Sequence, residues 1–105
     1  MHNEIAVEDA AKRMGEDGVC VLDVRTPDER ARGYIAGSEN VDFHDGNFKS
    51  NIEKLDHSKT YIVHCRGGGR SGKTVTMMQE LGFTACYNLT GGFNEWVKKG
   101  MRVVR

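Results

Sequence analysis

The chain has 105 residues, of which 38% are hydrophobic and 29% charged, and its 15 basic and 15 acidic residues give a net charge of zero. This balance predicts one soluble globular domain over residues 1–105, and it excludes an electrostatic case for nucleic acid or a membrane surface as partner. The N-terminus lacks the pattern of a secretory leader and no apolar run is long enough to span a bilayer, so we expect a cytoplasmic protein.

The three cysteines, Cys20, Cys65 and Cys86, are an odd number and lack the spacing of metal ligands. Neither a disulfide framework nor a zinc site is predicted from them, and a reducing compartment fits this usage. Cys20 lies inside an apolar run, where we expect an inert packing thiol.

The first half of the chain predicts a helix, a buried strand and a second, short helix. One helical face, which Gly15 ends, is formed by Val7, Ala10, Ala11 and Met14. Residues 19–24 are a continuous apolar run, typical of a strand buried on both faces of a parallel sheet. Thr26 as N-cap and Pro27 at the first helical position begin the short helix, and Gly33 ends it.

Asp23, near the end of that buried strand, could act as a catalytic acid or base. A carboxylate in this place more often holds loop N–H groups or an arginine, and we expect that structural role.

The remaining elements continue the alternation of strands and helices. Residues 41–43 are expected to form a small strand, and the spacing of Phe48, Ile52 and Leu55 predicts a helix. A strand over 61–65 follows, then a helix that begins near Ser71 and ends at Gly82. A last strand over 86–89 precedes a helix whose shared face is Phe93, Trp96 and Val97. This order predicts an α/β fold with a mainly parallel sheet, in which ligands bind beyond the carboxyl ends of the strands.

Cys65 stands at such an end and opens a loop in which three glycines, Gly67, Gly68 and Gly69, lie between Arg66 and Arg70. We expect the glycines to adopt positive φ and to turn their N–H groups toward one point. The helix that begins near Ser71 adds further N–H groups and its dipole. Such a cup binds an anion and lowers the pKa of a thiol, so Cys65 is interpreted as a nucleophile.

This loop has three other possible readings. Cys65 could be a core thiol beside a glycine turn. Residues 67–74 also match the nucleotide-binding P-loop pattern, but no Asp follows Thr74 to bind magnesium. A cysteine phosphatase would place an arginine six positions after the nucleophile, whereas Arg70 is five positions after Cys65. The shorter loop suits a single sulfur atom better than a tetrahedral phosphate. His64 should point to the opposite face of its strand, so we expect it to pack and not to act as a base.

The pattern Cys-Arg-x-Gly-x-Arg resembles the active-site loop of rhodaneses, which carry sulfur as a cysteine persulfide. Four stretches resemble the rhodanese-like family in the right order: 22–25 with Glu29, 33–40, 65–71, and 90–92 with Trp96. Three residues depart from the family pattern, namely Arg30 where an aromatic is common, Tyr34 in place of histidine and Ser38 in place of alanine.

The resemblance implies a five-stranded, mainly parallel sheet with helices on both faces. It also implies that Cys65 takes sulfur from a small anionic donor such as thiosulfate and passes it to cyanide or a thiol. The N–H groups of Gly67, Gly68 and Gly69 and the Ser71 hydroxyl would hold the added sulfur, and Arg66 and Arg70 would bind the donor. No metal or organic cofactor is implied.

Two function classes stay open from the sequence. The alternative to an enzyme is a sulfur-carrier or redox-sensing module that exchanges sulfur only with a protein donor or acceptor. A phosphatase or arsenate reductase ranks below both.

Overall fold

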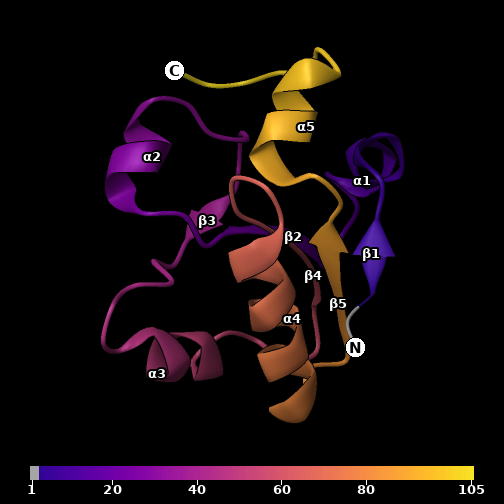
Figure 1. Cartoon of the computed structure of the whole chain (residues 1–105). Coiled ribbons are helices and arrows are strands. Elements are labelled where there is room, and N and C mark those ends of the chain that lie inside the picture. The colour runs from indigo at the N-terminus through magenta and orange to yellow at the C-terminus, as the bar shows by residue number, and fades with distance from the viewer. Residues whose placement is uncertain (1–2) are drawn as a thin grey trace.

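The computed structural model describes residues 3–105, which form one five-stranded sheet with the strand order β1-β5-β4-β2-β3 (Figure 1). Every pair of neighbouring strands in it is parallel. The strands are β1 (Glu4–Ile5), β2 (Val19–Asp23), β3 (Glu39–Asn40), β4 (Thr60–His64) and β5 (Ala85–Leu89). The predicted α/β fold with a parallel sheet is therefore confirmed.

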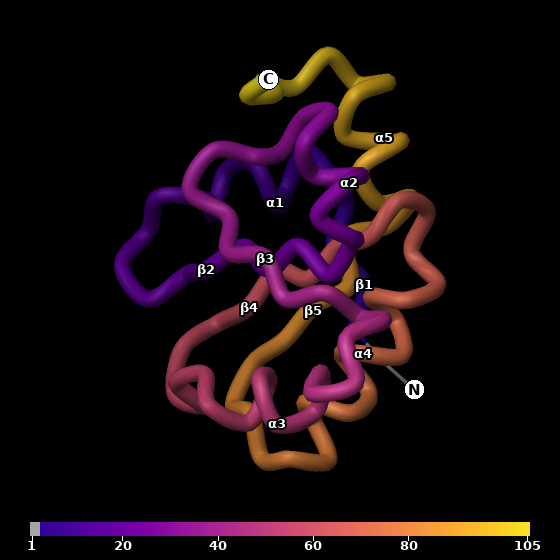
Figure 2. Tube along the Cα trace, turned by 90° about the vertical axis from the view of Figure 1, so that its left-hand side faces the viewer, coloured from indigo at the N-terminus to yellow at the C-terminus, as the bar shows by residue number. Residues whose placement is uncertain are grey.

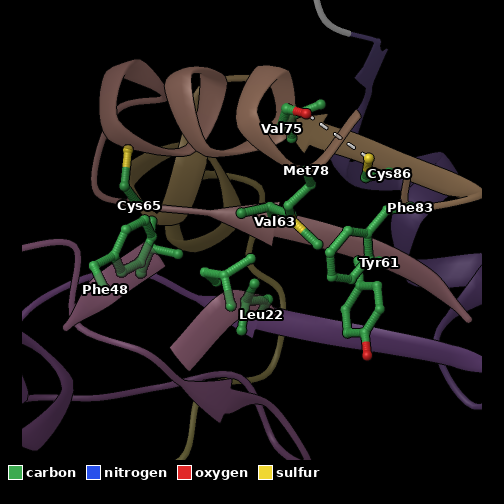
Figure 3. Packing of buried hydrophobic residues seen from close by; sticks show 11 residues of the cluster. Leu22, Phe48, Tyr61, Val63, Cys65, Val75, Met78, Phe83 and Cys86 are labelled. Atoms are coloured by element: carbon green, nitrogen blue, oxygen red, sulfur yellow. Dashed lines mark hydrogen bonds between the residues drawn. The ribbon is translucent and has the colours of Figure 1, made fainter. Parts of the chain in front are cut away.

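Helices cover both faces of the sheet because alternate strand residues point to opposite sides. The helices are α1 (Val7–Arg13), α2 (Pro27–Ala31), α3 (Phe48–Glu53), α4 (Gly69–Glu80) and α5 (Gly92–Lys98). From β4, Tyr61 and Val63 pack with α3 and α4, whereas Ile62 packs with α1 and α5. Figure 3 shows the first of these two cores. In the described part of the chain, no helix is long and apolar enough to cross a membrane.

The short helix α2 begins as predicted. The Thr26 hydroxyl accepts from the backbone N–H of Glu29 (3.2 Å), and the Glu29 carboxylate accepts from the N–H of Thr26 (3.0 Å). This reciprocal capping box stabilises a helix of five residues that has no buried side chain.

The structure differs from the sequence-based description in three places. The small strand lies at Glu39–Asn40 and not over 41–43, because β2 ends at Asp23 and Asp23 pairs with Asn40. The N-terminal strand β1 was not predicted, since two residues show no periodicity. Val97 is 41% exposed, because α5 packs against the core through Trp96, which is 5% exposed.

The three departures from the family pattern contact one another. The Arg30 guanidinium lies 4.4 Å from the Tyr34 ring and donates to the hydroxyl (2.9 Å) and the carbonyl (2.7 Å) of Ser38. Arg30 also donates to Asp23 (3.2 Å). Arg30 therefore contacts both of the other unusual residues, Tyr34 through its ring and Ser38 through hydrogen bonds, and joins α2 to the segment before β3.

Candidate functional site

Cys65 directly follows β4, and α4 begins four residues later at Gly69. The side chain of Cys65 is only 2% exposed, whereas Arg66 and Gly67 are exposed at the surface. Figure 3 shows its sulfur at the N-terminal end of α4, turned away from the labelled core side chains. The thiol thus lies beneath the surface of an exposed loop.

Hydrogen-bond donors surround the sulfur. The N–H of Gly68 donates to Cys65 Sγ at 3.0 Å, and Ser71 Oγ lies 3.3 Å from the same atom. Burial raises the pKa of the Cys65 thiol, but the hydrogen-bond donors around the sulfur, among them the N–H groups of Ser71, Gly68 and Gly67, outweigh it and lower the pKa. These contacts favour the thiolate, which is the nucleophilic form of cysteine.

Only one of the three loop glycines needs its special conformation. Gly68 has φ of +115°, whereas Gly67 and Gly69 lie outside the left-handed region. A Cβ at Gly67 or Gly69 would meet no atom within 4 Å. The expectation that all three glycines adopt positive φ is therefore wrong for two of them, because the first turn of α4 already begins at Gly69.

Two further glycines, Gly91 and Gly92 at the start of α5, lie against the same loop. The N–H of Phe93 donates to the carbonyl of Cys65 (2.8 Å), and the N–H of Asn94 donates to that of Arg66 (3.0 Å). Figure 1 and Figure 2 both show the loop before α4 beside the start of α5. A Cβ on Gly92 would lie 2.6 Å from the Arg66 oxygen, so no larger residue fits.

This contact with α5 explains how the loop points its N–H groups at the sulfur. In a planar trans peptide the carbonyl and the next N–H point in opposite directions. Because the carbonyl of Arg66 turns toward α5, the N–H of Gly67 turns toward the other side of the loop, where the sulfur lies. The glycine pair stood in the sequence as a signature, but its contact with the loop could not be seen there.

The two loop arginines differ in their surroundings. Arg70 donates from both terminal nitrogens to the Glu29 carboxylate, at 2.7 and 2.9 Å. The Arg66 side chain is 64% exposed and its Nε lies 3.5 Å from Glu29. The hydrogen bonds from Arg70 lower the pKa of Glu29 to about 2, so the pair is ionised at neutral pH. Glu29 is a site residue that the sequence reasoning did not place next to Arg70.

Asp23 and His64 lie beneath the loop and are completely buried. Asp23 accepts from the backbone N–H, Nε and Nη2 of Arg25. His64 Nδ1 lies 3.2 Å from the Cys65 carbonyl, and its ring stacks on Phe93 with centroids 5.9 Å apart. Burial lowers the pKa of His64. Both residues therefore have the structural surroundings that were expected, at neighbouring strand ends.

The P-loop reading finds no support in the geometry. Thr74 donates its hydroxyl back to the carbonyl of Arg70 (2.8 Å) and is buried, while Lys73 is exposed. The Thr74 hydroxyl, which a P-loop would use to bind magnesium, is therefore already bonded to the main chain of α4. Among residues 3–105, no group of three or more His, Cys, Asp or Glu side chains could hold a metal ion.

The chain is similar to known proteins in both sequence and fold. The rhodanese-like domain model matches residues 6–99. Thiosulfate sulfurtransferase 16 of Arabidopsis thaliana is 34% identical over 90 residues, which cover 76% of this chain and 75% of that one. Thiosulfate sulfurtransferase GlpE of Pseudomonas paraeruginosa is 33% identical over 86 residues, covering 82% and 76%. A rhodanese-related protein from Thermoplasma volcanium superimposes with a TM-score of 0.88 at 30% identity, covering 98% of both chains.

Proposed function

Since the chain belongs to the rhodanese-like domain family, we propose that it is a sulfurtransferase that carries sulfur as a persulfide on Cys65. The observation that supports this most is the 3.0 Å hydrogen bond from the Gly68 N–H to the Cys65 sulfur, in a loop whose carbonyls point away toward α5. Donors arranged in this way stabilise a thiolate and then a terminal persulfide sulfur.

The reaction has two steps. The Cys65 thiolate attacks the outer sulfur of thiosulfate, the sulfur–sulfur bond of the donor breaks, and its electron pair leaves with sulfite. The persulfide on Cys65 then transfers its terminal sulfur to cyanide or a thiolate, and the electron pair of the broken bond returns to Cys65. The N–H groups of Gly67, Gly68 and Gly69 hold the anionic terminal sulfur between the steps, beside the side chain of Ser71.

The charges around the loop suit a transient anion. Apart from the Cys65 thiolate itself, Arg66 and Arg70 bring two positive charges and Glu29 one negative charge, which leaves one net positive charge. Arg66, as the exposed arginine, meets the donor and the leaving sulfite, while Arg70 is held at the loop by Glu29. This moderate charge attracts an anionic donor without retaining the product tightly.

The experiment is to incubate the full chain with thiosulfate and to look for one added sulfur on Cys65 by mass spectrometry. Thiocyanate formation after addition of cyanide measures turnover. Cys65→Ser should abolish both signals without changing the thermal unfolding temperature, and Cys20→Ser at a half-buried thiol is the matched control. Unchanged thiocyanate formation in Cys65→Ser would contradict the proposal.

The burial of Cys65 supports a second candidate, exchange with a protein persulfide. Cys65 is only 2% exposed and Arg66 beside it is exposed, so a donor must come into close contact with the loop to reach the sulfur. If a persulfidated protein loads Cys65 and thiosulfate does not, the chain is a sulfur carrier. Turnover of p-nitrophenyl phosphate that depends on Cys65 would instead indicate a phosphatase.

A further inference from the structure

The hydroxyl of Ser71 has two acceptors within reach. Its Oγ lies 2.5 Å from Asn88 Oδ1 and 3.3 Å from Cys65 Sγ. Ser71 and Asn88 are both buried, at 0% and 4% exposed. A hydroxyl carries a single proton, so it can donate fully to only one of these partners.

The orientation of the Asn88 amide follows from its other contacts. Asn88 Nδ2 donates to Glu4 Oε2 (2.9 Å) and lies 3.3 Å from the carbonyl oxygen of Gly68. Both of these partners are acceptors, so a flipped amide would place its oxygen against two oxygens. The Oδ1 atom therefore faces Ser71, and two oxygens only 2.5 Å apart repel unless a proton lies between them.

We propose that Asn88 is a positioning residue that draws the Ser71 proton away from Cys65 and thereby keeps the Cys65 thiolate a stronger nucleophile. The inference rests on the proposed function of Cys65. With the proton directed to Asn88, the sulfur is held by the N–H groups of the loop, beginning with Gly68 at 3.0 Å. Ser71 Oγ then faces the sulfur with a lone pair. This lone pair can accept a hydrogen bond from the neutral thiol, but it donates no hydrogen bond to the thiolate.

This arrangement matters because thiolate nucleophilicity falls as the thiol becomes more acidic. The backbone N–H groups of the loop already favour the thiolate. A further full hydrogen bond from Ser71 would increase the thiolate population but would weaken its attack on a sulfur donor. By accepting the Ser71 proton, Asn88 keeps the thiolate population somewhat lower and the nucleophilicity of the thiolate higher.

The test replaces Asn88 by leucine, which has a similar shape and cannot accept a proton. Ser71 is then free to donate to the thiolate, and a hydrogen bond to a charged acceptor is equivalent to about one pKa unit. With the known dependence of nucleophilicity on pKa, alkylation of Cys65 by iodoacetamide should become about threefold faster at acidic pH and about threefold slower at alkaline pH. The plots of alkylation rate against pH for the wild type and for Asn88→Leu should therefore cross.

The measurement follows alkylation of the Cys65 peptide by mass spectrometry in the full chain, because the other two cysteines also react. Asn88→Leu, Ser71→Ala and the double variant form a cycle, and Asn51→Leu on α3 is the matched control. We expect Ser71→Ala alone to change the dependence of the alkylation rate on pH little. In the double variant, where no hydroxyl can donate to the thiolate, the profile should no longer cross that of the wild type. Circular dichroism checks that each variant is folded.

Other outcomes would overturn the inference. A loop that merely lost support would make Asn88→Leu slower at acidic pH, and an unchanged profile would show that Asn88 does not direct the proton. If Asn88→Leu does not fold, Asn88→Val serves in its place with the same expected crossing. Alkylation does not require sulfur transfer, so a crossing without thiocyanate formation would refute the proposed function alone, and turnover without a crossing would refute this inference alone.

Discussion

The ends of β2 and β4 lie side by side, with Asp23 in register with His64, yet the two strand ends present opposite kinds of site. The Asp23 carboxylate is completely buried and receives donors from two arginine side chains and one backbone N–H. The Cys65 sulfur receives donors mainly from the main chain, in a loop that is exposed on its outer side. A charged side chain whose contacts are already filled supports the fold, whereas a nucleophile needs donors that leave one side free for a substrate.

Asp23→Asn should give the largest loss of stability, because it leaves Arg25, which is 4% exposed, without a countercharge. Removing one partner of a buried ion pair costs about 3–5 kcal/mol. Urea unfolding measures this loss, and the exposed Asp28→Asn on α2 should cost less than about 1 kcal/mol. Equal effects of the two substitutions would show that the filled contacts of Asp23 do not support the fold.

Gly92→Ala should affect both stability and sulfur transfer. The new Cβ would lie 2.6 Å from the Arg66 carbonyl at φ of +62°, so the loop or the start of α5 must move. We expect a loss of about 2 kcal/mol in the free energy of unfolding together with the loss of persulfide formation on Cys65. Gly46→Ala, where a Cβ meets no atom within 4 Å, is the control. Normal persulfide formation in Gly92→Ala would mean that α5 does not orient the loop.

Glu29→Gln should have the smallest effect, of about 1 kcal/mol at neutral pH, because the pair with Arg70 is partly exposed. The folded protein lowers the pKa of Glu29 from 4.5 to about 2, so its contribution is present above about pH 4.5 and is lost as the pH falls toward 2. Urea unfolding at several pH values should therefore show the difference between wild type and Glu29→Gln shrinking over that range. The exposed Glu53→Gln should show no such trend, and a difference that stays constant with pH would contradict the ion pair.

The fold could be predicted from the sequence where its signals are local. The helical face that includes Val7 and Ala10, and the capping box at Thr26, each depend on residues a few positions apart. The candidate nucleophile, Cys65, also came from a local signal, because a strand, a cysteine, glycines and a helix start follow one another directly.

The missing parts of the site are contacts between distant segments. Glu29 and Arg70 are 41 positions apart, and Asn88 is 17 positions from Ser71. Pairs so far apart leave no periodic pattern in the sequence. The contacts of Arg70 with Glu29 and of Ser71 with Asn88 are therefore seen only in the structure. The close approach of Gly92 to Arg66 belongs to the same class. Glycine is required at position 92 because a Cβ would collide with the Arg66 carbonyl, and that neighbour is known only from the structure.

The most direct test of the account is a titration of the individual cysteines by site-resolved alkylation across pH. Cys65 and Cys86 are both 2% exposed, but burial alone acts on Cys86 and raises its pKa, whereas the loop donors lower that of Cys65. The account predicts that Cys65 titrates below the value of a free cysteine, about 8.5, and Cys86 above it. A Cys65 thiol that titrates at or above that value would contradict the claim that the loop makes it a nucleophile.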